Sequence, residues 1–327
     1  MTAFVCIYGI FTKKGATMPE IQVSELNALT THEATMIKLA EENYHDNVSR
    51  VAKMICEENN LRAVLLAGPS GAGKTTTANL ICDAVKALGE ECIVLSLDDF
   101  YLDHTDERYP KNERGEYDYE RPESLDLDAL RATLGCITRA EDFIIPKYDF
   151  KKSARISEKI HPAMPDGCVI IEGLHALNPI ISDSLPSDKI KKVFVSVSTN
   201  INDADERIIS GRKVRFVRRL VRDSIFRGAD AARTLGLWQG VLAAEDIYLY
   251  PYKELADVAF DTFHSFELGA MKPRAEALLS ESAVSDNAYA KIVSSALKKI
   301  APVDASKIPD NSLIREFIGG GIYENRY

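Results

Sequence analysis

The chain has little of what marks membrane, secreted or nucleic-acid-coating proteins. In its 327 residues, no apolar run approaches the roughly 18 residues that a membrane-spanning helix needs. Six cysteines are present without a C-x-x-C pair, which argues against a disulfide scaffold or a zinc site. Positive charge is not in excess, because 40 Lys and Arg stand against 49 Asp and Glu, giving a net charge of −9. A nucleic-acid partner is therefore not expected.

What is present matches a globular protein that is not bound to a membrane. Hydrophobic residues make up 46% and charged residues 27% of the chain, and this length predicts about two domains or one large domain with extensions. The apolar run 3–11 lacks the basic residues that precede the core of a signal peptide. We therefore expect a cytoplasmic protein with reduced thiols.

Short apolar runs alternate with helical patterns along the chain. This alternation predicts the α/β class, with a parallel sheet covered by helices on both faces. Buried strands are predicted at 63–67, 92–97, 168–171, 192–197 and 258–260. Helices are predicted within 33–60 and at 74–88, 125–138, 204–227, 231–248, 266–280 and 287–300, with a loop at 103–124. We divide the chain into an N-terminal helical extension (1–60), a central domain (61–265) and a C-terminal helical extension (266–327).

The motif GPSGAGKT at 68–75 follows the first of these strands and precedes a predicted helix. A match to G-x-x-x-x-G-K-T arises by chance in about one chain of this length in a hundred, and the strand–loop–helix context is the required one. The motif predicts a phosphate-binding loop for ATP, in which Lys74 reaches the β- and γ-phosphates and Thr75 ligates Mg²⁺. The predicted ATP-binding residues are Gly68, Pro69, Ser70, Gly71, Ala72, Gly73, Lys74, Thr75 and Thr76.

Carboxylates follow two other predicted strands. Glu172 ends the strand at 168–171 and is the candidate second ligand of Mg²⁺, with an ordinary surface role as the alternative. Asp98 and Asp99 follow the strand at 92–97, at the sheet edge where ligands bind in parallel sheets. A carboxylate there can accept the proton of an attacking hydroxyl. Either one can instead simply cap the next turn, and this alternative is stronger for Asp99.

Five motifs in order resemble those of the uridine kinase and phosphoribulokinase family, with the uridine–cytidine kinase branch nearest. They are SLDDFY (96–101), YDYERPESLD (117–126), PKYDFKKSAR (146–155), VIIEGLHALNP (169–179) and RRLVRDSIFRG (218–228). The resemblance covers about 62–265 and implies a P-loop three-layer sandwich. SLIREFIGGG (312–321) further resembles bacterial uridine-kinase-like proteins, which usually carry an extra N-terminal domain of the threonyl-tRNA synthetase type. We do not expect that domain in this chain.

The resemblance implies an ATP- and Mg²⁺-dependent kinase of a small acceptor, most simply the 5′-hydroxyl of uridine or cytidine. By position it assigns the catalytic base to Asp98, ribose binding to Glu120 and the nucleoside-flanking aromatics to Tyr148 and Phe150. It also implies that Arg219 contacts the acceptor, and that Arg222 and Arg227 clamp the phosphates.

Three departures leave the acceptor open. The base-reading positions of the family hold Ser153, Ala229 and Leu237 here, and a site that hydrogen-bonds a base normally discriminates through such groups. A kinase of another ribosyl compound or a sugar phosphate is therefore the first alternative. A non-catalytic nucleotide-binding switch is the second. A homo-oligomer is compatible with the sequence, and residues 1–60 suit either a dimerisation arm or the remnant of a lost domain.

The segment 204–227 is rich in arginine, and we expect a helical lid that closes over the triphosphate. The alternatives are a solvated helix face paired with nearby acids and a nucleic-acid patch. Its positive residues are Arg212, Lys213, Arg215, Arg218, Arg219, Arg222 and Arg227. Trp238, the only tryptophan, is expected to pack in the core rather than stack on a substrate, and His175 suits either a structural or a substrate-contacting role.

Overall fold

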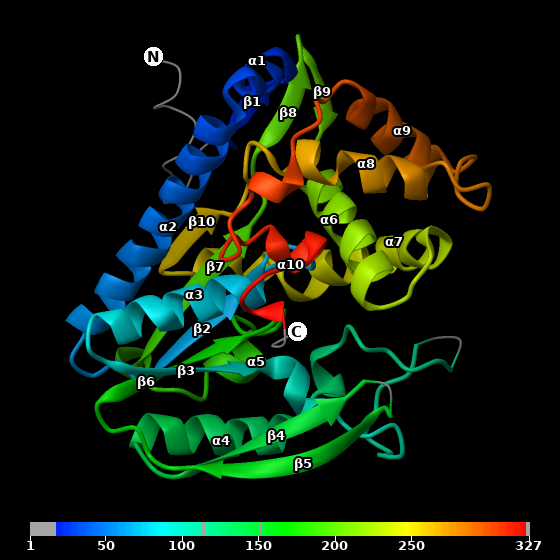
Figure 1. Cartoon of the computed structure of the whole chain (residues 1–327). Helices are drawn as coiled ribbons and strands as arrows, with labels where there is room; N and C mark the ends of the chain where they lie inside the picture. Colours follow the sequence, from blue (N-terminus) through cyan, green and yellow to red (C-terminus); the bar gives the residue numbers. More distant parts are fainter. Residues whose placement is uncertain (1–17, 113–114, 151, 325–327) are drawn as a thin grey trace.

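The computed structural model describes residues 18–112, 115–150 and 152–324 (Figure 1). The apolar run 3–11 and Cys6 lie outside the described residues. The strands are β1 (Glu20–Gln22), β2 (Ala63–Ala67), β3 (Glu91–Ser96), β4 (Phe143–Asp149), β5 (Ala154–His161), β6 (Gly167–Glu172), β7 (Ile190–Ser196), β8 (Asn200–Asp203), β9 (Glu206–Ile209) and β10 (Val258–Asp261). The helices are α1 (Val23–Leu29), α2 (Glu33–Glu57), α3 (Lys74–Ala87), α4 (Leu127–Arg139), α5 (Pro179–Ser182), α6 (Gly211–Phe226), α7 (Ala231–Tyr248), α8 (Glu267–Leu279), α9 (Ala288–Lys298) and α10 (Arg315–Ile318).

Five of these strands form one parallel sheet in the order β10-β7-β2-β6-β3. They are the five predicted apolar runs, each placed within about two residues of its predicted ends. Strands β2 and β6 are buried along their whole length, as expected for a sheet covered on both faces. The predicted α/β fold is confirmed.

The side chains of β2 show how the layers are built. Val64 and Leu66 point into one apolar core, together with residues of α2, α3, α6 and α8. Ala63, Leu65 and Ala67 point into a second core, shared with α4 and α5. This alternation follows from the two-residue period of a strand. The result is a helix–sheet–helix sandwich whose sheet carries the phosphate-binding loop at its carboxyl edge.

The N-terminal elements pack against this sandwich. Helix α2 lies along α3 (Figure 1), and the Tyr44 hydroxyl is 2.7 Å from the Thr77 hydroxyl on α3. Strand β1 pairs in parallel with β8, and β8 pairs with β9 to complete a three-stranded sheet. Residues 20–57 therefore contribute to the same core as the central sheet. The division of the chain into segments 1–60, 61–265 and 266–327 stays a prediction.

Two hairpins depart from the sequence prediction. The predicted helix 204–227 is wrong in its first part, because β8 and β9 form a hairpin turning at Ala204, which has a φ of 51°. Helix α6 begins only at Gly211, where a Cβ would lie 2.0 Å from the Val197 carbonyl oxygen. The antiparallel hairpin of β4 and β5 was not predicted at all.

No helix among the described residues is long and apolar enough to cross a membrane. Cys56, Cys82, Cys92, Cys136 and Cys168 are free thiols, as expected. Trp238 is fully buried and donates to the Tyr289 hydroxyl at 3.1 Å. Its predicted core role is confirmed.

Candidate active site

The phosphate-binding loop connects β2 to α3. Gly71 and Gly73 have φ angles of 73° and 82°, a left-handed conformation that only glycine adopts without strain. A Cβ on Gly71 would also lie 2.9 Å from the Arg215 carbonyl oxygen. The first helical bond of α3 runs from the Thr77 N–H to the Gly73 carbonyl at 2.9 Å. The N–H groups before it are those that a phosphate chain approaches, so the loop fits the predicted ATP.

Two buried arginines of α6 donate hydrogen bonds to backbone carbonyl groups of this loop. Arg215 donates to the Ser70 carbonyl at 2.8 Å, and Glu245, its ion-pair partner, accepts the Ser70 N–H at 2.9 Å. Arg218 donates to the Gly71 carbonyl at 3.1 Å and pairs with Glu267. Both arginine side chains are at most 1% exposed. The expectation that they act as lid residues is wrong, because each is buried and paired with a carboxylate in the core.

Glu172 lies at the end of β6, beside the start of α3. Its Oε1 accepts hydrogen bonds from the Ser96 hydroxyl at 2.8 Å and the Thr75 hydroxyl at 3.3 Å. Burial, followed by the negative charge of Asp98, raises the pKa of Glu172 to about 7, against the opposing effect of Lys74. The described residues contain no cluster of three or more His, Cys, Asp or Glu that could hold a metal. A hydroxyl and one carboxylate suit Mg²⁺, which usually keeps several waters and phosphate ligands.

Asp98 lies on the one-turn helix 97–100 that follows β3. The residue is partly open to solvent. The surrounding protein nevertheless removes water from its carboxylate, which raises the pKa of Asp98 against the opposing positive charges of Lys74, Arg227 and Arg222. The neighbouring Asp99 pairs with Lys147 at 3.0 Å and accepts the Tyr148 N–H at 3.3 Å. Asp99 thus ties the turn to β4, whereas Asp98 faces the phosphate-binding residues. This difference favours Asp98 as the base.

An aromatic cluster adjoins Asp98. The Tyr101 ring lies 5.7 Å from Tyr148 and 5.5 Å from Phe150, centroid to centroid. Tyr148 is almost fully buried, while 56% of Phe150 is exposed. Glu120 also adjoins the cluster, and burial raises its pKa against the opposing charge of Arg219. The structure brings Glu120, Tyr148 and Phe150 into one region, and their substrate roles stay predictions.

Three further arginines gather on one buried carboxylate, whereas Arg212 pairs with Asp246 at the surface. Asp223 is paired with Arg219 at 3.3 Å, Arg222 at 2.8 Å and Arg227 at 3.6 Å. The positive charge of Arg222, followed by burial, lowers the pKa of Arg227. Three guanidinium groups share this one carboxylate, and the charges of Asp98 and Glu120 also act on this group of arginines. Guanidinium groups are suited to binding phosphate oxygens.

Sequence reasoning missed several residues around the P-loop. Ser96 and Tyr101 lie inside the motif SLDDFY, so only their roles were overlooked. Glu245, Glu267 and Glu316 contact the P-loop or its arginines from distant helices. Glu245 and Glu267 carry no local signal, whereas Glu316 lies in the quoted motif SLIREFIGGG, which gave no hint of its contact with Thr76. His175 is buried, which lowers its pKa to about 4. A neutral structural role therefore suits it, and a substrate contact stays untested.

Comparison with known proteins gives a consistent match. Residues 64–268 match the model of the "Phosphoribulokinase / Uridine kinase family". A uridine kinase of Halobacterium salinarum is 28% identical over 67% of this chain and 88% of its own length. A uridine kinase of Deinococcus deserti is 31% identical over 59% of this chain and 84% of its own. A solved structure titled a possible uridine kinase from Bacillus stearothermophilus has 18% identity and a TM-score of 0.43, covering 66% of this chain and 98% of that one.

Proposed function

Because the chain belongs to the phosphoribulokinase/uridine kinase family, we propose that it transfers the γ-phosphoryl group of ATP to a nucleoside 5′-hydroxyl, that of uridine or cytidine. The position of Asp98 carries the proposal. This carboxylate lies near Lys74, Arg222 and Arg227 and also near Tyr101. A hydroxyl held against the aromatic cluster would meet both a proton acceptor and a phosphate site.

In this proposal the P-loop holds the phosphates through its backbone N–H groups, and Lys74 neutralises charge on the β- and γ-phosphates. Thr75 and Glu172 would hold Mg²⁺, which supplies positive charge for phosphoryl transfer. Arg222 and Arg227 stabilise the charge that develops on the transferred group. Asp98 accepts the proton of the attacking hydroxyl, which makes that oxygen a better nucleophile.

The aromatic cluster supports a nucleoside acceptor. A base gains about 1–3 kcal/mol by stacking on an aromatic side chain, and Phe150 presents an exposed ring beside Tyr101. In this proposal Glu120 accepts hydrogen bonds from the ribose hydroxyls. Base specificity does not follow, because Ser153, Ala229 and Leu237 stand at the positions that would read the base, and 52% of Leu237 is exposed.

A phosphorylated sugar is the second candidate acceptor. The observation in its favour is that Arg219, Arg222 and Arg227 gather around Asp223. A second phosphate, beyond those of ATP, would be attracted to these guanidinium groups. A nucleotide-binding switch without turnover is the remaining alternative, and it makes no use of the placement of Asp98.

The test is ADP release with Mg-ATP across a panel of acceptors, with Lys74→Ala as the blank. The panel contains uridine, cytidine, purine nucleosides, ribose and ribulose 5-phosphate. We expect strong stimulation by a pyrimidine nucleoside. Stimulation by ribulose 5-phosphate alone would keep the chemistry and replace the acceptor. ATP binding without stimulation by any of these compounds would favour the switch.

A further inference from the structure

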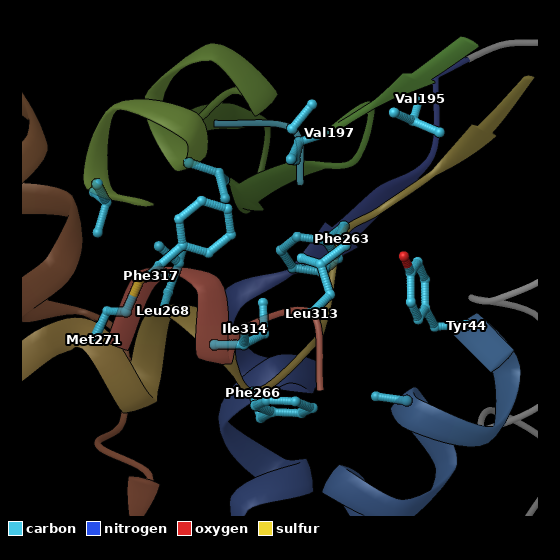
Figure 2. Close-up of a cluster of buried hydrophobic side chains, with 14 of the residues drawn as sticks. Tyr44, Val195, Val197, Phe263, Phe266, Leu268, Met271, Leu313, Ile314 and Phe317 are labelled. Atoms are coloured by element: carbon cyan, nitrogen blue, oxygen red, sulfur yellow. The ribbon is translucent and has the colours of Figure 1, made fainter. Parts of the chain in front are cut away.

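The C-terminal segment 312–318 lies directly on the P-loop. Leu313, Ile314 and Phe317 are fully buried and belong to the cluster that also contains Phe263 and Phe266 (Figure 2). Leu313 touches the loop itself, because a Cβ on Gly73 would lie 2.6 Å from its Cδ1. The segment is therefore anchored by apolar packing and cannot leave the loop without exposing these side chains.

One charged side chain of this anchored segment reaches the P-loop helix. The carboxylate of Glu316 accepts a hydrogen bond from the Thr76 hydroxyl at 2.7 Å and another from the Thr76 N–H at 3.4 Å. Only 6% of Glu316 is exposed, and Thr76 is fully buried. Thr76 is the third residue of α3 and precedes the first residue that donates within the helix, Thr77.

The N–H groups at this end of a P-loop helix bind the α- and β-phosphates of a nucleotide. The position next to Thr76 already holds an anion that belongs to the protein. A carboxylate is stabilised there for the same reason as a phosphate, since both face the positive end of the helix. The two anions repel each other, so they cannot both occupy this position at no cost.

We propose that Glu316 sets the affinity for the nucleotide by competing with its α-phosphate for Thr76. Because the backbone of 312–318 is anchored, the change on binding is a movement of the Glu316 side chain away from Thr76. The residue thereby weakens the binding of every donor that places a phosphate at Thr76. This inference rests on the proposed ATP-binding function.

Calorimetric binding of ATP without acceptor tests the proposal in the full chain. Glu316→Gln keeps the shape and an acceptor for the Thr76 hydroxyl but removes the charge. We expect it to bind ATP about threefold to tenfold more tightly, the effect of one charge at a helix N-terminus. Asp83→Asn is the matched control. Asp83 lies on the same helix, about 10 Å beyond Thr76 at 1.5 Å per residue, and accepts from Tyr323 of the same C-terminal region at 2.7 Å. We expect no change in its ATP affinity.

Unchanged or weaker ATP binding by Glu316→Gln, at an unchanged melting temperature, would overturn the proposal and leave Glu316 a support of Thr76. If Glu316→Gln does not fold, Glu316→Asp decides. Its carboxylate is withdrawn from Thr76 by one methylene, and we again expect tighter binding, so weaker or equal binding overturns the proposal. Absence of ATP binding by both wild type and variant would overturn the proposed function and this inference together. Binding by the variant alone would support this inference and count against the proposed function of the wild type.

Discussion

Arg218 and Glu267 form a two-point ion pair in which both side chains are fully buried. The Arg218 Nε lies 2.5 Å from Glu267 Oε2, and its Nη2 lies 2.9 Å from Oε1. Arg218 also donates to the Gly71 carbonyl of the P-loop and, at 2.7 Å, to the Thr262 carbonyl. The pair therefore joins α6, α8 and the end of β10 to the back of the P-loop. The backbone conformation of the predicted phosphate-binding loop is therefore supported by a contact outside the loop.

Replacing one member of this pair is expected to destabilise the protein strongly. Arg218→Met leaves the Glu267 carboxylate buried without its partner, and the expected loss is about 3–5 kcal/mol of unfolding free energy. The double variant Arg218→Met/Glu267→Leu removes both charges and should lose less. Arg212→Met is the control, because Arg212 pairs with Asp246 at the surface and such pairs contribute about 0–1 kcal/mol. Urea denaturation measures all three, and equal losses for Arg218→Met and Arg212→Met would contradict the argument.

Asp98 and Asp99 offer a comparison within one turn. Asp98→Asn removes the proposed proton acceptor and should lower kcat about 10³-fold, equivalent to about 4 kcal/mol of barrier. Asp99→Asn should cost far less, since Asp99 binds Lys147 and the Tyr148 N–H rather than facing the phosphates. ADP release with the best acceptor measures both. Near-normal turnover by Asp98→Asn would show that Asp98 is not the catalytic base.

The turnover of the wild type should also depend on pH through Asp98. Desolvation by the surrounding protein raises the pKa of Asp98 above the ordinary value for aspartate. A base must be ionised to accept a proton, so kcat/KM should begin to fall at a higher pH on acidification than a free aspartate would allow. Asp99→Asn should move this fall to lower pH, because the negative charge of Asp99 contributes to the raised pKa of Asp98, while the residual activity of Asp98→Asn should lose the fall altogether. A profile that is unchanged in Asp98→Asn would assign the titration to another group.

Arg222 should affect the chemical step more than the binding of ATP. It donates twice to Asp223 and lies beside Arg227 in the group of arginines around this carboxylate. Removing one preorganised donor from developing charge typically lowers kcat about 10²-fold or more. We expect this for Arg222→Ala, with Arg212→Ala as a control on the same helix. Steady-state kinetics with varied ATP separate kcat from KM. A rise in KM at constant kcat would show that Arg222 serves only in binding.

The features that sequence alone predicted are those encoded by neighbouring residues. The run AVLLA, the motif GPSGAGKT and the helix after them specify strand, loop and helix within 26 residues (63–88), and the structure reproduces each boundary closely. The same holds for the carboxylates at the ends of β3 and β6, since the edge of a parallel sheet on which they lie follows from strand direction alone. These local signals were sufficient to place most candidate residues in one region.

The features that were missed depend on contacts between distant parts of the chain. Strand β5 is mostly exposed and carries mixed polar and apolar residues, so its periodicity was weak. The hairpin of β8 and β9 is short and charged, and it is completed by β1 from the N-terminal region. The sequence of the arginine-rich segment 204–227 shows where the positive charges are, but not toward which part of the protein each arginine side chain points. Its division into buried residues such as Arg218 and residues near Asp223 is set by Glu245 and Glu267, which no sequence spacing connects to it.

Glu41 provides a test of the packing of the N-terminal helix α2 on the rest of the protein. Glu41 is 6% exposed, and its carboxylate oxygen lies 3.8 Å from an imidazole nitrogen of His45 and 3.9 Å from one of His264. Burial raises the pKa of Glu41 to about 7, with Ser312 and Arg315 opposing. Burial also lowers the pKa of His45 and takes that of His264 to about 3. The neighbouring histidines are therefore neutral when Glu41 titrates.

The sign of the resulting pH dependence is fixed by the proton count. Between pH 4.5 and about 7, the folded chain keeps a proton on Glu41 that the unfolded chain has lost. Unfolding free energy must then fall as pH rises through this window, and the penalty is fully present above about pH 7. Glu41→Gln stays neutral, so it should gain up to about 3 kcal/mol over wild type at pH 8 and little at pH 4. Urea denaturation at both pH values measures this, with Glu42→Gln as the control because Glu42 is exposed on the same helix. A gain at pH 8 no larger than that of the control would show that Glu41 ionises freely in the folded protein.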